Sequence, residues 1–164
     1  MDTTGLLIVC KNDYAHQFLA EQLKEHSITR KYRAIVHGVI KEDTLTIEGS
    51  IGRHPQDRKK MAVNVRNGKP AVTHVTVLQR FAKYTYVECQ LETGRTHQIR
   101  VHLASIQHPL LGDSVYGRAK EDFRLQGQTL HAMVFGFIHP RTKEYMEFEA
   151  PLPEYFSELL RKLK

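Results

Sequence analysis

The segment "LETGRTHQIRVHLASIQHPLLGDSVYG", residues 91–117, passes from a strand through a turn into a helix within a few positions. The strand ends at Leu91, a glycine turn follows, and the helix is predicted to start near Thr96. The dipeptide His108–Pro109 should end the helix, because a residue before proline disfavours helical backbone angles. The apolar positions at helical spacing, which should form the buried stripe, are Ile99, Leu103 and Ile106.

The junction between this strand and helix is rich in side chains that can bind an anion. They are Arg95, Thr96, His97, Gln98 and Arg100. A helix N-terminus carries unpaired N–H groups and a partial positive charge, so cations placed there indicate an anionic partner. That partner is a carboxylate or a phosphate. The alternative is that Arg95 and Arg100 form ordinary ion pairs at the surface.

Other catalytic patterns are missing from the sequence. His97, His102 and His108 are spaced five and six residues apart, which does not match the i, i+4 pair of a zinc-binding helix. Glycine-rich nucleotide motifs do not occur, nor does a G-x-S-x-G nucleophile motif. The sequence therefore predicts neither a metal nor a nucleotide cofactor.

The remainder of the chain predicts strands in antiparallel runs with a few helices. The apolar run Leu6–Cys10 is interpreted as a buried strand, and Leu45–Glu48 as a short antiparallel partner of residues 31–40. Residues 49–73 should form a long hairpin-like loop with a turn at Asn67–Gly68. The fold class is α+β, a mixed and mostly antiparallel sheet with a few flanking helices. Further strands are expected at 73–81, 84–91, 129–139 and 145–150, and helices at 11–27 and 154–164. Asn12 can cap the first of these helices, and Thr85, Val87, Cys89 and Leu91 should share one face of the strand at 84–91.

Composition indicates one soluble domain of 164 residues with a net charge of +6. Residues 30–66 contain nine Lys or Arg against four acids, so most of the excess charge lies there. This local excess favours a polyanionic partner, with a solvated surface loop as the alternative. The sequence contains no run long enough to span a membrane, so we expect a cytoplasmic protein. Cys10 and Cys89 are expected to be buried free thiols.

Residues 91–117 closely resemble the hallmark segment of the RluA/RluD-type pseudouridine synthases. That family's pattern is roughly L-x-T-G-R-x-H-Q-I-R-x-H, followed by H-P-[IL]-x-G-D-x-x-Y-G. The resemblance covers essentially the whole chain and implies the pseudouridine synthase fold. Other segments that resemble the family in order are "KYRAIVHG", "GSIGRHPQDRKKMAV", "GKPAVTHV", "LHA" and "FEAPLP".

The resemblance implies isomerisation of uridine to pseudouridine in rRNA or tRNA, with the base flipped out and without a cofactor. Tyr32 matches the tyrosine that stacks on the target base and assists removal of the proton at C5. Arg100 matches the arginine that pairs with the catalytic aspartate. Residues that would shape the pocket and meet RNA are Arg95, His97 and Gln98, and those that would contact phosphates are Arg53, Arg58, Lys59 and Lys60.

The family's first motif reads roughly H-R-L-D-x-x-T-S-G-L-L, and the chain begins "MDTTGLL". Aligned on T-x-G-L-L, the catalytic aspartate falls at the position just before Met1. We therefore expect a monomeric catalytic domain over residues 1–164 that is truncated at its N-terminus, lacks an S4 domain and leaves Arg100 without its carboxylate partner. The alternative is a non-catalytic RNA-binding module. A third hypothesis, that Asp2 takes the catalytic place, requires a two-residue shift of the strand.

Overall fold

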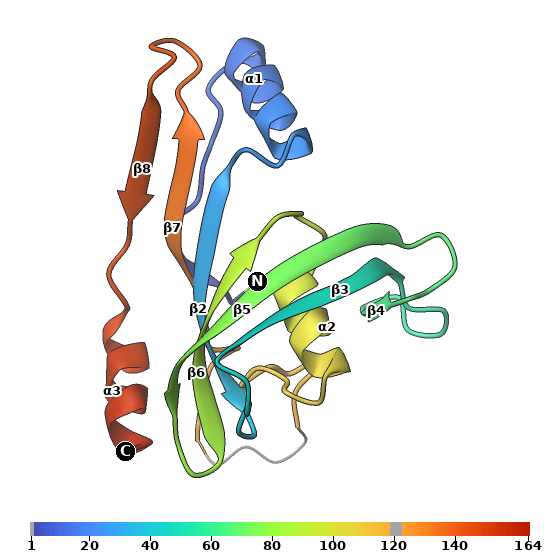
Figure 1. Cartoon of the computed structure of the whole chain (residues 1–164), viewed down its shortest axis with the longest axis vertical. Coiled ribbons are helices and arrows are strands. Elements are labelled where there is room, and N and C mark those ends of the chain that lie inside the picture. Colours follow the sequence, from blue (N-terminus) through green and yellow to red (C-terminus); the bar gives the residue numbers. More distant parts are fainter. Residues whose placement is uncertain (1, 119–122) are drawn as a thin grey trace.

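One mixed eight-stranded sheet with three helices makes up the described part of the chain, shown as a computed structural model in Figure 1. The structure describes residues 2–118 and 123–164. The strands lie in the order β1-β7-β2-β6-β5-β3-β4, and β8 pairs with β7. The bounds of the elements are β1 (Thr4–Gly5), α1 (Asp13–Lys24), β2 (Thr29–His37), β3 (Thr44–Arg53), β4 (Met61–Val63), β5 (Lys69–Arg80), β6 (Tyr84–Leu91), α2 (Gln98–Ser105), β7 (Leu130–Ile138), β8 (Tyr145–Glu149) and α3 (Glu154–Lys162).

All strand pairs in the described sheet are antiparallel except β1 with β7. The predicted class, an α+β fold with a mixed and mostly antiparallel sheet, is confirmed. The helix over 11–27 is also confirmed, including its cap: the Asn12 side chain accepts a hydrogen bond from the Ala15 N–H at 2.9 Å. In the part of the chain described, no helix has the length and apolar character that a membrane crossing requires.

The two faces of the sheet are covered by different helices. Alternate residues of β2 point to opposite sides, so Ala34 and Val36 pack in one apolar cluster and Ile35 packs in another. The first cluster lies under α2 and includes Val87, Cys89, Ile99 and Leu103. The second is completed by Phe156 and Leu159 of α3. Helix α2 is thereby packed against this face of the sheet, and the strands that it approaches most closely are β3, β4 and β5.

The predicted buried strand at Leu6–Cys10 is wrong. Only Thr4 and Gly5 pair with β7, and the backbone leaves the sheet after Leu6 N–H donates to the Ala132 carbonyl at 3.0 Å. Leu7 is 87% exposed and Val9 is 74% exposed, so only one side of this segment is covered. An apolar run is ambiguous because its composition does not reveal whether both of its faces are buried.

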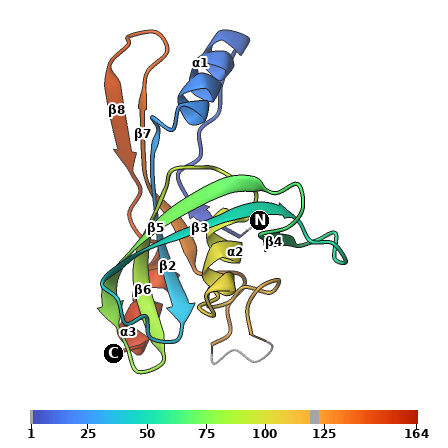
Figure 2. The same ribbon diagram turned by 45° about the vertical axis from the view of Figure 1, so that its right-hand side comes forward.

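The region 45–73 is also arranged differently from the prediction. Leu45–Glu48 lies inside β3, which pairs with β5 and β4, whereas β2 pairs with β6 and β7. The expected long loop is largely strand, because β3 continues to Arg53 and β5 begins at Lys69. The turn at Asn67–Gly68 is supported by a φ of 64° at Asn67. Figures 1 and 2 show the hairpin of β3 and β4 projecting from the body of the molecule.

Candidate active site

A cleft of about 720 Å³ opens between β1, β2, β7 and the N-terminus of α2. It brings together five of the residues predicted from the family resemblance. The four basic residues predicted to contact phosphates lie outside it, at the β3–β4 hairpin. The predicted residues that line the cleft are Tyr32, Arg95, His97, Gln98 and Arg100.

Tyr32 reaches the cleft from the middle of β2, opposite a β-bulge in β7, where Met133 is the extra residue. On one side of the bulge Lys31 pairs with Val134, and on the other Tyr32 pairs with Ala132. A bulge bends a strand locally and re-aims the neighbouring side chains. Burial raises the pKa of the Tyr32 hydroxyl, with a smaller opposing effect from the charge of Arg30. Tyr32 therefore presents a neutral ring to the cleft at neutral pH.

The amide of Gln98 fixes the turn that leads into α2. Its Oε1 accepts hydrogen bonds from the Thr93 hydroxyl at 2.8 Å and from the Arg95 N–H at 3.0 Å. Its Nε2 donates to the Val72 carbonyl at 2.9 Å and to the Thr73 hydroxyl at 3.0 Å. These four bonds use the amide's donors and acceptor sites. Contact between Gln98 and RNA stays a prediction, while the observed bonds show that the amide positions the turn.

Arg100 has a buried carboxylate partner, so the expectation that it lacks one is wrong. Its Nε and Nη2 donate to the two carboxylate oxygens of Asp113, each at 2.7 Å. The Arg100 side chain is 8% exposed and that of Asp113 is 0% exposed. Sequence reasoning missed Asp113, although the conspicuous G-D step of the hallmark segment could have indicated it.

The surroundings of this ion pair keep both groups charged. The hydrogen bond with Asp113 raises the pKa of Arg100, with burial opposing it. Burial acts to raise the pKa of Asp113, but Arg100 and the backbone N–H groups of Val115 and Tyr116 outweigh it, so the pKa lies below its usual value. The Arg100 guanidinium also lies 5.1 Å from the centre of the Tyr116 ring. The pair therefore ties α2 to the loop that follows it.

His97 begins helix α2 in a left-handed conformation with a φ of 56°. Its Nδ1 lies 2.9 Å from the Tyr116 hydroxyl, which accepts a hydrogen bond from the Met61 N–H at 2.8 Å. Burial, followed by the charge of Arg100, lowers the pKa of His97, so the ring is neutral at pH 7. The Tyr116 hydroxyl thus bonds both the Met61 N–H and the His97 ring. It also links the base of the β3–β4 hairpin to the cleft.

The short strand β1 forms one wall of the cleft and depends on a glycine. Gly5 has a φ of 99°, and a Cβ at this position would overlap the Ala132 carbonyl oxygen. The Thr4 hydroxyl lies 2.9 Å from Nδ1 of His131, whose Nε2 lies 3.1 Å from the Ala150 carbonyl. Because a carbonyl only accepts, Nε2 carries the proton and Thr4 donates to Nδ1. His131, from the "LHA" segment, thus holds β1 against β7.

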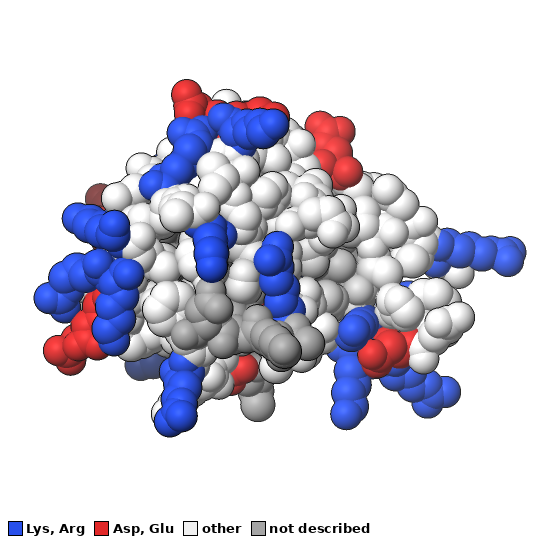
Figure 3. Space-filling model, turned by 90° about the horizontal axis from the view of Figure 1, so that it is seen from below, with Lys and Arg blue, Asp and Glu red and all other residues white. Residues whose placement is uncertain are grey.

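The β3–β4 hairpin carries the other predicted basic residues. Among the described residues, none of these four cations forms an ion pair with a carboxylate. Figure 3 shows basic side chains projecting from one face of the molecule, including its right-hand end, where the hairpin lies. Unpaired cations on a projecting hairpin can bind a polyanion. The residues are Arg53, Arg58 and Lys59, which are exposed, and Lys60, which is half-buried.

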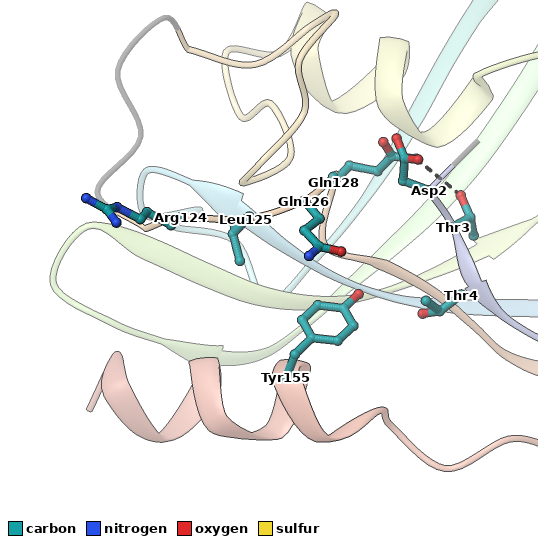
Figure 4. Close-up of a pocket in the computed structure, with 9 residues that line it drawn as sticks. Asp2, Thr3, Thr4, Arg124, Leu125, Gln126, Gln128 and Tyr155 are labelled. Carbon is teal, nitrogen blue, oxygen red and sulfur yellow. Dashed lines mark hydrogen bonds between the residues drawn. The ribbon is translucent and has the colours of Figure 1, made fainter.

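A second cavity, of about 570 Å³, adjoins the cleft and shares Thr3, Thr4 and Gln128 with it. Figure 4 shows Asp2 beside the segment 124–128 of this cavity, with Tyr155 of α3 on the other side of that segment. Asp2 lines the second cavity and not the cleft that contains Tyr32. Its charge contributes to the raised pKa of Arg100, after that of Asp113.

The chain matches the protein family described as RNA pseudouridylate synthase over residues 1–105. It is 58% identical to the RNA pseudouridine synthase YlyB of Bacillus subtilis (strain 168) over 164 residues. It is 47% identical to the ribosomal large subunit pseudouridine synthase D of Nitrosomonas europaea over 170 residues. The alignments cover 99% of this chain but 53% and 49% of those relatives, so the chain spans about half of their length.

Solved structures agree with these sequence matches. The human RNA pseudouridylate synthase domain containing 1 superposes with a TM-score of 0.75 at 28% identity, covering 93% of this chain and 72% of that one. The human RNA pseudouridylate synthase domain containing 4 superposes with a TM-score of 0.74 at 25% identity, covering 93% of this chain and 68% of that one.

Proposed function

Because the chain belongs to the RNA pseudouridylate synthase family, we propose that its cleft holds a uridine of RNA while that uridine is isomerised to pseudouridine. The reaction breaks the glycosidic C–N bond, turns the uracil, and forms a C–C bond to the same sugar. The target base must leave its stack to reach the cleft. Ribosomal RNA is the first substrate to test, because the Nitrosomonas europaea relative is named for the large ribosomal subunit; tRNA is the second.

The observation that carries this proposal is the convergence of an aromatic ring and cationic groups on one cleft. Tyr32 offers a neutral ring on which a uracil can stack, and its hydroxyl can relay the proton removed from C5. His97 offers a neutral imidazole, and Arg95 offers a guanidinium that lines the cleft. Arg100 lies beside them with its guanidinium held in place, and its charge balanced, by Asp113. Such a site suits a polar base attached to a phosphodiester chain.

The basic hairpin is proposed to hold the RNA on which the cleft acts. Its unpaired cations are joined to the cleft through the Tyr116 hydroxyl, which bonds Met61 of β4 and His97 of α2. Lys59 and Lys60 are the positions to test, because replacing both with Glu reverses two charges there. We expect weaker binding of structured RNA and a shallower dependence of affinity on salt, since fewer counterions are released.

Catalysis also needs a carboxylate beside C1′ of the target nucleoside, and the resemblance places it at the position before Met1. Asp2 lies two positions further along, roughly 6–7 Å at the rise of a strand. A displacement of even about 1 Å can lower a rate about a hundredfold. We therefore propose that Asp2 is not catalytic and that residues 1–164 need this carboxylate to form pseudouridine.

The second candidate function is RNA binding without catalysis. The Arg100–Asp113 pair favours this second function, because a structural role alone explains why Arg100 is present. An intact Arg100 therefore does not by itself indicate an active enzyme. The two functions differ in one measurable product, since only the enzyme forms pseudouridine.

The decisive experiment measures pseudouridine by mass spectrometry after incubation with unmodified rRNA and tRNA. The chain extended by His-Arg-Leu-Asp before Met1 should form pseudouridine, and the same extension ending in Asn should not. Asp2→Ala in the active form should matter little. Product formed by residues 1–164 alone and lost on Asp2→Ala would make Asp2 the catalytic residue. RNA binding without product from any form would favour the binding module.

The binding test has a matched control at the other end of the molecule. The double variant of Lys162 and Lys164 to Glu also reverses two charges, but it alters α3 and the residues after it, away from the hairpin (Figure 1). Equal loss of RNA affinity in the Lys59/Lys60 and Lys162/Lys164 variants would show that the hairpin is not the RNA contact.

A further inference from the structure

A smaller cavity, of about 330 Å³, borders the cleft, because Arg95 lines both. It lies where the end of α1, the start of β2 and the turn before α2 meet. Basic side chains dominate its lining, and no acidic residue contributes to it. The other lining residues are Leu23, Lys24, His26, Arg30 and Gly94.

Arg30 is the buried cation of this pocket and has no carboxylate partner among the described residues. It is 7% exposed. Its Nη2 donates to the Glu92 carbonyl at 3.0 Å, while its Nε is buried without a hydrogen-bond partner. Arg keeps its charge in proteins, and a buried charge without a counterion is costly. Burial accordingly lowers the pKa of Arg30 from its usual value.

The acidic residues nearest in the chain are turned to other partners. The Glu92 carboxylate bonds to Nε2 of His74 at 2.5 Å, and Glu21 bonds to the exposed Lys24 at 3.1 Å. The Glu92 carbonyl also accepts a hydrogen bond from Nδ1 of His26 at 2.7 Å. Lys24 is therefore paired, whereas among the described residues no carboxylate forms an ion pair with Arg30 or Arg95.

Gly94 fits against the Arg30 guanidinium with no room for a side chain. A Cβ on Gly94 would overlap Nη1 of Arg30. The glycine of the "TGR" turn therefore allows the guanidinium to lie beneath the turn, with its remaining donors next to the pocket that it lines.

We propose that this pocket binds a phosphate of the RNA backbone beside the nucleotide held in the cleft. The inference rests on the proposed function, because it makes RNA the source of the phosphate. Arg30 and Tyr32 are two residues apart on one face of β2, roughly 6–7 Å along the strand. An adjoining nucleotide can span that separation, and Nη1 of Arg30, which is neither enclosed like Nε nor bonded to Glu92 like Nη2, can donate to a phosphate oxygen. Arg95, shared by both cavities, lies between the two sites.

The test compares Arg30→Gln with Lys31→Gln in the full chain. Each variant removes one positive charge from β2, but Lys31 lies on the opposite face, with its Nζ 3.8 Å from Glu88. The probe is a short fluorescent single-stranded RNA, and the readout is its Kd as a function of salt. We expect Arg30→Gln to raise Kd about tenfold, as loss of one charge-assisted hydrogen bond does. The salt slope should fall by about 0.7, while Lys31→Gln should change Kd less than about twofold.

Two further variants keep the proposal testable if Arg30→Gln fails to fold. Gly94→Ala keeps every charge but displaces the guanidinium, and Lys24→Gln changes an exposed side chain of the pocket. Both should raise Kd several-fold in folded protein, whereas Lys31→Gln should not. Competition by inorganic phosphate at constant ionic strength distinguishes a free-phosphate site from an RNA site.

The outcomes separate this inference from the proposed function. If the native chain binds the RNA but Arg30→Gln, Gly94→Ala and Lys31→Gln behave alike, the phosphate site is refuted and the proposed function stands. If inorganic phosphate binding depends on Arg30 while RNA affinity does not, the pocket takes free phosphate and the RNA inference is wrong. If the native chain binds no RNA, both the phosphate site and the proposed function are refuted.

Discussion

Replacing Arg100 with methionine should give the protein a gain in stability in mild acid that the native ion pair does not provide. In the native chain the folded-state pKa of Asp113 lies below its unfolded value. Its contribution to stability is therefore complete above the unfolded pKa of about 3.9 and is lost as pH falls through the folded pKa. In Arg100→Met, burial is opposed only by two backbone N–H groups, so the folded-state pKa should rise above the unfolded value. That variant gains stability on acidification from about pH 7 to pH 5.

The expected loss at neutral pH follows from the burial of the pair. Breaking a buried ion pair by removing one partner costs about 3–5 kcal/mol. Asp113 is 0% exposed, but its two hydrogen bonds from backbone N–H groups remain at 2.9 and 3.0 Å. We therefore expect the lower end, about 3 kcal/mol, which is a large part of the 5–15 kcal/mol that stabilises a typical domain.

Urea unfolding of four proteins at both pH values provides the measurement: the native chain, Arg100→Met, Asp113→Asn and the double variant. The free energies of unfolding give the coupling between the two side chains. The double variant lacks the titrating carboxylate and should lose the pH response of Arg100→Met. Asp113 is not the essential partner of Arg100 if Arg100→Met lowers the free energy of unfolding by less than about 1 kcal/mol and responds to pH as the native chain does.

Three other predictions concern the frame of the site. Gly5→Ala should detach β1 from β7, because its Cβ overlaps the Ala132 carbonyl oxygen; hydrogen exchange should rise at Leu6 N–H, and unchanged protection there would contradict this. Burial raises the pKa of the Cys89 thiol to about 12, so Ellman's reagent at mildly alkaline pH should label half-buried Cys10 alone until the protein unfolds. Gln98→Leu should cost more than about 2 kcal/mol in chemical denaturation, because it leaves buried polar groups unpaired; a near-neutral change would show that water replaces the amide.

The sequence alone was sufficient for features that depend on neighbouring residues. The alternation along β6 predicted that Thr85, Val87 and Cys89 share one face, and each of them is fully buried. Asn12 predicted the start of α1, because a cap acts within one turn. The hallmark segment identified the family. Five of the site residues that the family resemblance predicted, Tyr32 among them, line one cleft. The chemistry proposed for that cleft rests on the same resemblance.

Tertiary structure alone decided the features that depend on which segments meet. Strands with the same alternation can pair with any neighbour, so the sequence did not reveal that β3 pairs with β5 rather than β2. An apolar run does not disclose which of its faces is covered, and Leu7 and Val9 proved exposed. Likewise, a cation's charge is visible in the sequence but its counterion is not. Packing gave Arg100 a partner in Asp113 and left Arg30, buried on the same sheet, without one, because burial and contact are set by the whole fold.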